Sequence, residues 1–151
     1  MDVPAGSFQP DPEVIRWRIH FRSSPGRVFA ALATPEGRAG FWAESAEEEA
    51  GEIRFVVPGG IESRGRIIEA VPARRFVAGY FGWTVRFDLR ADGDGGTDLE
   101  MTCLGVPPGD REEVIAGWVS VLMAMKAAVD FGVDLRNHDP ARTWWQGYAD
   151  N

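Results

Sequence analysis

The sequence predicts an α+β domain in which a curved antiparallel sheet of about six to seven strands wraps around one long C-terminal helix. Three observations lead to this fold class. Between residues 13 and 104 the chain contains short runs in which apolar and polar residues alternate, the period of half-buried strands. Turns rich in glycine and proline join these runs, which favours antiparallel neighbours. One apolar stretch, 110–135, follows, and as a helix it would span about 39 Å.

The strands and the short helices are predicted in chain order. Residues 13–21 alternate, so one face of this strand carries only apolar side chains: Ile15, Trp17, Ile19 and Phe21. Ser24-Pro25 predicts the start of a helix over 25–33, because serine is a good N-cap and proline is favoured in the first turn. A second helical turn is predicted at 36–41. The remaining predicted strands are 45–50, 52–57, 61–71, 75–81, 83–90 and 97–104.

The stretch 110–135 is predicted to be the helix around which the sheet curls. Its apolar residues recur at steps of three and four, which places them on one helical face: Val114, Trp118, Leu122, Met125 and Val129. Asp110 is the expected N-cap, and Gly132 is expected to end or bend the helix because glycine is a poor helix-interior residue. Polar and charged residues interrupt the apolar run, so we expect it to fall short of a membrane span.

Composition and charge exclude several function classes. The formal net charge is −7 and the pI is near 4.8, which argues against a protein that binds nucleic acid or an anionic membrane. The single cysteine, Cys103, rules out an internal disulfide and fits a cytoplasmic protein. The first residues have no basic start followed by an apolar run, so no signal peptide is expected. We expect one domain at 13–136, between a flexible lead-in at 1–12 and an aromatic tail at 137–151.

Several short motifs occur in an order and at a spacing that resemble a known superfamily. They are FRSSPGRVF at 21–29, Phe41-Trp42, GRIIEAVPARR at 65–75, GTDLEM at 96–101, and Gly117-Trp118 followed by Leu122, Met125 and Lys126. Over about residues 13–135 the chain resembles the START-like (SRPBCC, helix-grip) superfamily and, within it, the activator of Hsp90 ATPase homologue-like (AHSA1-type) family. The resemblance implies a hydrophobic cavity between sheet and helix, and no shared catalytic motif.

The chain departs from that family in two places. Cys103 stands late in the last predicted strand, where related sequences often carry a histidine, which argues against a histidine-based activity there. The tail beyond Leu135 extends past the usual end of the fold, and Trp144, Trp145 and Tyr148 make it too apolar for a free terminus. These aromatic residues either dock on the domain itself or, as a sharper hypothesis, close the cavity mouth or contact a second subunit.

Large inward-facing apolar residues form the candidate ligand-binding site. Two interpretations stay open. One is ordinary core packing, in which each fully buried large side chain contributes about 1.5–3 kcal/mol of stability. The other is a ligand-lined cavity, since pockets are mostly apolar with a few placed polar groups. The candidate lining residues are Trp17, Phe29, Phe41, Trp42, Phe55, Phe76, Tyr80, Trp83, Phe87, Met101, Trp118, Leu122 and Met125.

No pattern in the sequence indicates a catalytic or metal-binding site. His20 and His138 belong to no cluster with ligand spacing, and no paired carboxylates stand out as a general acid and base. Cys103 is expected to be a small buried hydrophobe. The acidic residues between 44 and 52 are expected to form a solvated sheet edge. We therefore expect no catalytic residue, no metal ligand and no cofactor.

Together these observations predict a non-catalytic cytoplasmic protein that binds a small hydrophobic ligand, as a monomer or homodimer. Two alternatives stay open. The first is a chaperone-interacting or stress-response regulatory protein that uses its surface, with an Hsp90-type chaperone as partner. The second is an enzyme of cyclase or hydrolase type acting on a hydrophobic or polyketide-like substrate, which would need polar groups at the cavity wall.

Overall fold

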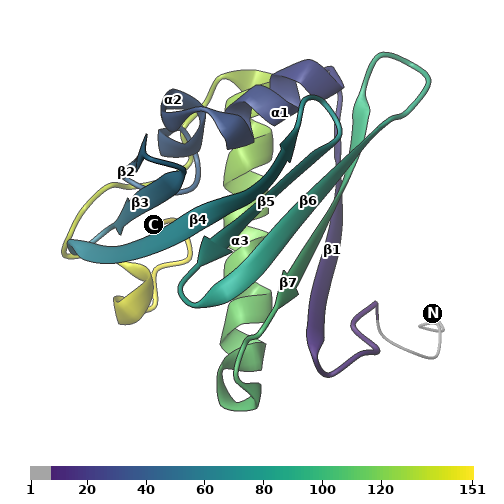
Figure 1. Cartoon of the computed structure of the whole chain (residues 1–151). Coiled ribbons are helices and arrows are strands. Elements are labelled where there is room, and N and C mark those ends of the chain that lie inside the picture. The colour runs from purple at the N-terminus through teal and green to yellow at the C-terminus, as the bar shows by residue number, and fades with distance from the viewer. Residues whose placement is uncertain (1–7) are drawn as a thin grey trace, which may run out of the picture.

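The structure, a computed structural model, describes residues 8–151, so the first seven residues of the predicted lead-in lie outside it. The described chain forms a seven-stranded antiparallel sheet in the order β1-β7-β6-β5-β4-β3-β2. The long helix α3 lies along one face of the sheet, and α1 and α2 lie near one of its ends (Figure 1). The elements are β1 (Val14–Phe21), α1 (Pro25–Ala33), α2 (Pro35–Ala39), β2 (Ser45–Glu49), β3 (Glu52–Val57), β4 (Ile61–Val71), β5 (Arg75–Tyr80), β6 (Trp83–Ala91), β7 (Thr97–Leu104), η1 (Pro108–Asp110), α3 (Arg111–Phe131) and η2 (Trp144–Gln146).

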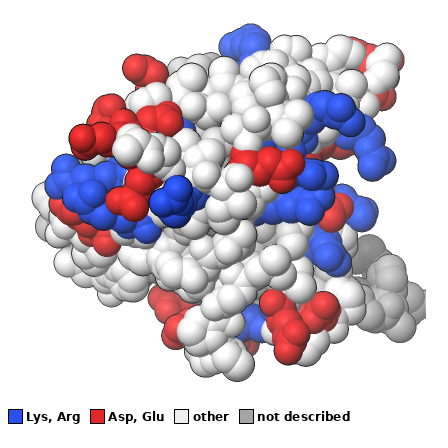
Figure 2. All heavy atoms as spheres, in the orientation of Figure 1, with Lys and Arg blue, Asp and Glu red and all other residues white. Residues whose placement is uncertain are grey.

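The predicted fold class is confirmed. Every predicted strand is present, with ends shifted by no more than a residue or two. Strand β1 pairs with β7 along its whole length, from Val14 opposite Leu104 to Phe21 opposite Thr97, so the first and last strands lie side by side. The alternation is also as predicted in β6 and β7, where the inward residues are buried: Val85, Phe87, Leu89, Leu99, Met101 and Cys103. On the opposite face of the sheet, basic and acidic side chains are interspersed (Figure 2).

Helix α3 ends where Gly132 was expected to end or bend it, but it begins differently from its prediction. It ends at Phe131, because Gly132 takes up a left-handed conformation with φ 65° and its N–H caps the Ala127 and Ala128 carbonyls. Asp110 precedes the helix, but its side chain makes no capping hydrogen bond. The reason is the 3₁₀ turn η1, which holds the Asp110 backbone at φ −100° and ψ −7° instead of the extended conformation of an N-cap.

The expectation that the long helix falls short of a membrane span is wrong on composition. The segment Pro108–Phe131 has 24 residues and a window of mean hydropathy 1.6, enough in length and composition to cross a bilayer. The core helix of a folded domain passes the same test, and Trp118, Leu122 and Met125 are buried against the sheet. The other side of the helix is apolar too, since Val119 and Met123 are 42% and 51% exposed. The side of the helix that faces away from the sheet is therefore apolar and only partly covered.

Candidate functional site

A pocket of about 660 Å³ opens between the sheet, α3 and the C-terminal segment, which we define as residues 134–151. The sheet contributes residues at two of its turns, β3–β4 and β5–β6, and the chain after α2 contributes a third patch: Val57, Pro58, Tyr80, Phe81, Trp83, Phe41 and Trp42. The first half of α3 forms the second wall. The C-terminal segment forms the third with Leu135, Arg136, Thr143, Trp144, Trp145, Ala149, Asp150 and Asn151.

Aromatic rings build the deep wall of the pocket. The Trp42 ring lies 4.7 Å from Phe55, 5.3 Å from Tyr80 and 6.1 Å from Trp118, measured between centroids. Trp83 continues the wall outward, with its ring 6.0 Å from Tyr80. These rings meet edge-on or tilted, which are favourable arrangements for aromatic pairs. The wall is therefore a connected aromatic network.

The candidate residues named from the sequence fall into two groups. Phe41, Trp42, Tyr80, Trp83 and Trp118 line the pocket. The others do not line it and lie instead in the core or packed against it: Trp17, Phe29, Phe55, Phe76, Phe87, Met101, Leu122 and Met125. Phe55 and Phe87 support the pocket from behind, because both rings contact Trp42.

Two parts of the pocket were absent from the candidate residues. The first is the exposed apolar side of α3, where Val119 and Met123 line the pocket. The second is the C-terminal segment, whose Trp144 lies 3.8 Å from the position that a Cβ on Gly117 would occupy. Two features of the sequence could have indicated these parts of the pocket. They are the apolar residues of the helix that lie outside its main stripe, and the aromatic residues of the tail. Trp145 and Tyr148 do not dock fully, since they remain 60% and 41% exposed.

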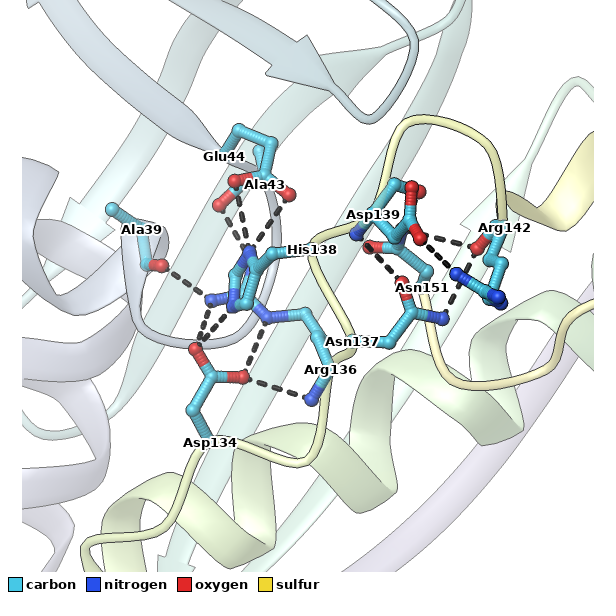
Figure 3. A network of polar contacts seen from close by, with 10 residues as sticks. All are labelled: Ala39, Ala43, Glu44, Asp134, Arg136, Asn137, His138, Asp139, Arg142 and Asn151. Carbon is cyan, nitrogen blue, oxygen red and sulfur yellow. Dashed lines mark hydrogen bonds and ion pairs between the residues drawn. The ribbon is translucent and has the colours of Figure 1, made fainter.

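The C-terminal segment is tied to the domain by hydrogen bonds at both of its ends. Near η2, the Trp144 indole N–H donates to Glu113 Oε1 at 3.1 Å, and Ser120 Oγ donates to the Ala149 carbonyl. Near the end of α3, Arg136 donates to the Ala39 carbonyl at 2.6 Å and to the Ala43 carbonyl at 2.8 Å (Figure 3). The segment is thus part of the folded domain, and it holds the third wall of the pocket in place.

His138 joins the same anchor by bridging two carboxylates (Figure 3). Its Nδ1 lies 2.8 Å from Glu44 Oε1, and its Nε2 lies 2.6 Å from Asp134 Oδ2. These hydrogen bonds, the one to Asp134 first, raise the pKa of His138 above its ordinary value of 6.5. Burial by itself would raise the pKa of Asp134. The hydrogen bonds from Arg136 and His138 outweigh burial and lower this pKa from 3.8 to about 2. A protonated ring can donate from both nitrogens at once, whereas a neutral ring can donate from only one.

We expect the replacement His138→Gln to destabilise the protein more at pH 6 than at pH 9. The folded pKa of His138 is raised, so its contribution is fully present below 6.5 and is lost as the pH rises through the folded value. The effect is modest because the side chain is 38% exposed. Thermal unfolding of both proteins across this pH range measures it. A difference that grows with pH would contradict the bridging role.

The remaining polar groups near the aromatic wall are neutral. Burial raises the pKa of the Cys103 thiol to about 11, and burial likewise raises the pKa of the Tyr80 hydroxyl. The indole N–H groups of Trp42 and Trp118 are buried and form no hydrogen bond of good geometry, although they approach Tyr80 and Cys103 and lower those pKa values slightly. Among the described residues, no group of three or more His, Cys, Asp or Glu side chains is placed to hold a metal ion.

A second hollow, of about 1050 Å³, lies over the outer face of β1, β5, β6 and β7. It is lined mainly by charged side chains, and several of these form ion pairs. Arg75 Nε lies 2.8 Å from Asp88, and Arg18 Nε lies 3.0 Å from Glu100. Such paired, exposed charges are typical of a solvated sheet face. The aromatic pocket, although smaller, is therefore the better candidate for a ligand site.

The sequence of residues 22–130 matches the family of activator of Hsp90 ATPase homolog 1-like proteins. The chain belongs to this family. The match begins just after β1 and covers β2 to β7, both short helices and α3 up to its last turn. It ends before the C-terminal segment, so in this family member the third wall of the pocket is built by residues outside the matched region.

Solved structures show the same fold at low sequence identity. The protein SSP2350 from Staphylococcus saprophyticus has a TM-score of 0.70 at 22% identity, over 82% of this chain and 96% of its own. The Aha1 dimer from Colwellia psychrerythraea has a TM-score of 0.69 at 18% identity, over 79% and 97%. DynU16, a protein of the dynemicin biosynthetic locus, has a TM-score of 0.68 at 16% identity, over 81% and 49%. No curated protein matches the chain in sequence.

Proposed function

We propose that this family member is a non-catalytic cytoplasmic protein that binds a small apolar ligand in the aromatic pocket. The observation that carries the proposal is the pocket itself. Its volume of about 660 Å³ falls within the range of about 300–1,000 Å³ that is usual for small-molecule sites. Aromatic and aliphatic side chains line it predominantly. A hydrophobic ligand that enters would therefore bury its apolar surface away from water, which is favourable.

The same geometry favours binding over catalysis. Burial raises the pKa values of Tyr80 and Cys103, so both groups stay protonated at neutral pH and cannot act as general bases. The carboxylates that line the pocket, Asp110, Glu113 and Asp150, are exposed and so lie at its rim. An enzyme acting on a polyketide-like substrate, the alternative left open by the sequence, would need an acid or base at the deep wall.

We expect a neutral naphthylamine dye to gain fluorescence on binding, and Trp83→Ala to weaken that binding about fivefold or more. Trp83 lines the pocket and is half-buried, so its removal takes away part of the wall. A loss of about 1 kcal/mol of apolar contact corresponds to this factor. A fluorescence titration measures both affinities.

The matched control for this variant is Phe131→Ala. Phe131 is an exposed aromatic residue at the end of α3 that does not line the pocket, and its removal should leave the affinity unchanged. An equal loss of dye affinity in the two variants would mean that the dye binds outside the pocket. A complete absence of binding, across a panel of long-chain and aromatic compounds, would refute the ligand-binding function.

Family membership supports one second candidate, a protein that acts on an Hsp90-type chaperone through its surface. The fold shared with the Aha1 dimer also supports a homodimer as one possible assembly. A pull-down with an Hsp90 homologue, together with the ATPase rate of that chaperone, separates this function from ligand binding. A change in rate that survives Trp83→Ala would favour the surface. Light scattering gives the oligomeric state.

A further inference from the structure

Acidic side chains occupy the rim of the pocket on two of its sides. Asp110 and Glu113 come from the start of α3, and Asp150 comes from the C-terminal segment opposite. All three are exposed, and within residues 8–151 none of them forms an ion pair with a basic side chain. Glu113 accepts a hydrogen bond from Trp144, and Asp150 accepts one from Asn137 at 2.9 Å. Neither of these neutral donors cancels the negative charge.

The one basic side chain among the described lining residues is already neutralised. Arg136 contacts both carboxylate oxygens of Asp134 at 3.1 Å and donates to two backbone carbonyls behind it (Figure 3). Its side chain is only 8% exposed, so the guanidinium is turned toward these partners. It is not free to pair with a ligand carboxylate. The uncompensated charge that a ligand meets at the pocket is therefore negative.

The aromatic rings of the pocket, like the acidic rim, favour a positively charged ligand. The faces of Trp, Tyr and Phe rings carry partial negative charge and attract cations, most strongly where water is excluded. Trp83, Trp118 and Trp144 line the pocket together with Tyr80. A ligand whose apolar part lies on these rings can place a cationic group near Asp110 and Glu113. A ligand carboxylate in the same place would be repelled by the rim and by the ring faces.

We propose that the pocket selects flat apolar ligands that carry a positive charge, such as arylalkyl ammonium ions and aromatic quaternary ammonium compounds, over carboxylates such as fatty acids. This inference rests on the proposed ligand-binding function, because it names the class of ligand for the same pocket. It predicts that the pocket discriminates between ligands of similar shape by their charge.

Three naphthalene compounds that differ mainly in the charge of a CH₂-linked group test the inference: naphthylmethylamine, which is protonated at neutral pH, naphthylmethanol and naphthylacetate. Calorimetry with the full chain should show the cation binding about tenfold or more tightly than the anion, with the neutral alcohol between them. The ratio of cation to anion affinity should shrink as NaCl is raised from about 20 mM to about 0.5 M, because salt screens the rim charges. This salt series needs no variant.

The variant Asp110→Asn/Glu113→Gln/Asp150→Asn should bring that ratio below about threefold, while keeping the oxygens that accept from Trp144 and Asn137. A matched control, Glu47→Gln/Glu49→Gln/Asp94→Asn, changes the net charge equally at exposed positions away from the pocket and should keep the ratio. Asp110→Asn alone, at a side chain that makes no capping bond, gives a partial fall should the triple variant not fold.

The outcomes separate this inference from the function on which it rests. If the neutral alcohol binds but the cation has no advantage, or if the control lowers the ratio as much as the rim variant, charge selection is overturned and ligand binding stands. If none of the three compounds binds to the wild-type protein, the proposed function fails and the inference fails with it.

Discussion

Replacing Arg38 with alanine is expected to lower the free energy of unfolding by about 3–5 kcal/mol. Arg38 has no exposed surface and lies between α2 and β2. Its guanidinium donates to the Ala46 carbonyl at 2.9 Å, to the Leu32 carbonyl at 3.1 Å and to Glu48 at 3.0 Å. Alanine would leave these buried carbonyls without their donor and would open a cavity, and both effects destabilise the folded state.

We also expect Arg38→Ala to weaken ligand binding in the pocket. The backbone carbonyl of Arg38 accepts from the Trp42 N–H at 2.8 Å, so the corner that the arginine stabilises also places Trp42 in the deep wall. Urea unfolding measures the stability, and the dye titration measures the binding. Arg54→Ala is the matched control, because Arg54 is exposed and paired only with Glu62 at the surface. A similar loss in both variants would mean that burial of Arg38 is not what stabilises the fold.

Removing residues 139–151 is expected to weaken ligand binding about tenfold or more and to lower the melting temperature. The truncation takes away Thr143, which is 3% exposed, and Trp144, whose indole donates to Glu113. The pocket then loses a wall, and the apolar side of α3 at Val119 and Met123, already partly exposed, becomes more accessible to water. Losing about 1.4 kcal/mol of ligand contact gives the tenfold factor.

Two point variants show which part of the segment matters. Trp144→Ala should reproduce much of the loss of binding, because Trp144 lines the pocket and approaches Gly117. Tyr148→Ala should not, because Tyr148 is 41% exposed and does not line the pocket. Light scattering of the truncated protein measures whether the segment also contributes to a subunit contact. If the truncation changes the mass of the assembly and leaves binding intact, the segment is a subunit contact and not a pocket wall.

Local sequence patterns were sufficient to predict the architecture. The two-residue alternation from Ile15 to Phe21 and from Leu99 to Cys103 specifies which face of each strand is buried, because successive side chains point to opposite faces. Ser24-Pro25 marks the start of α1, and Gly132 marks the end of α3 through a left-handed backbone that glycine adopts easily. Signals of this kind act within a few residues, so they can be read along the chain.

The pocket depends on contacts that no local pattern contains. The sequence predicts that Phe55, Phe87 and Trp42 all face inward, but only the packed structure puts Trp42 at the pocket and the other two behind it. The same holds for the third wall. That His138 would bridge Glu44 and Asp134, and that Trp144 would lie over Gly117, depends on where a segment of irregular backbone returns to the domain. Short-range periodicity is thus enough to predict the sheet and its helix. The pocket forms only when the chain packs, because its walls come from residues far apart in the sequence.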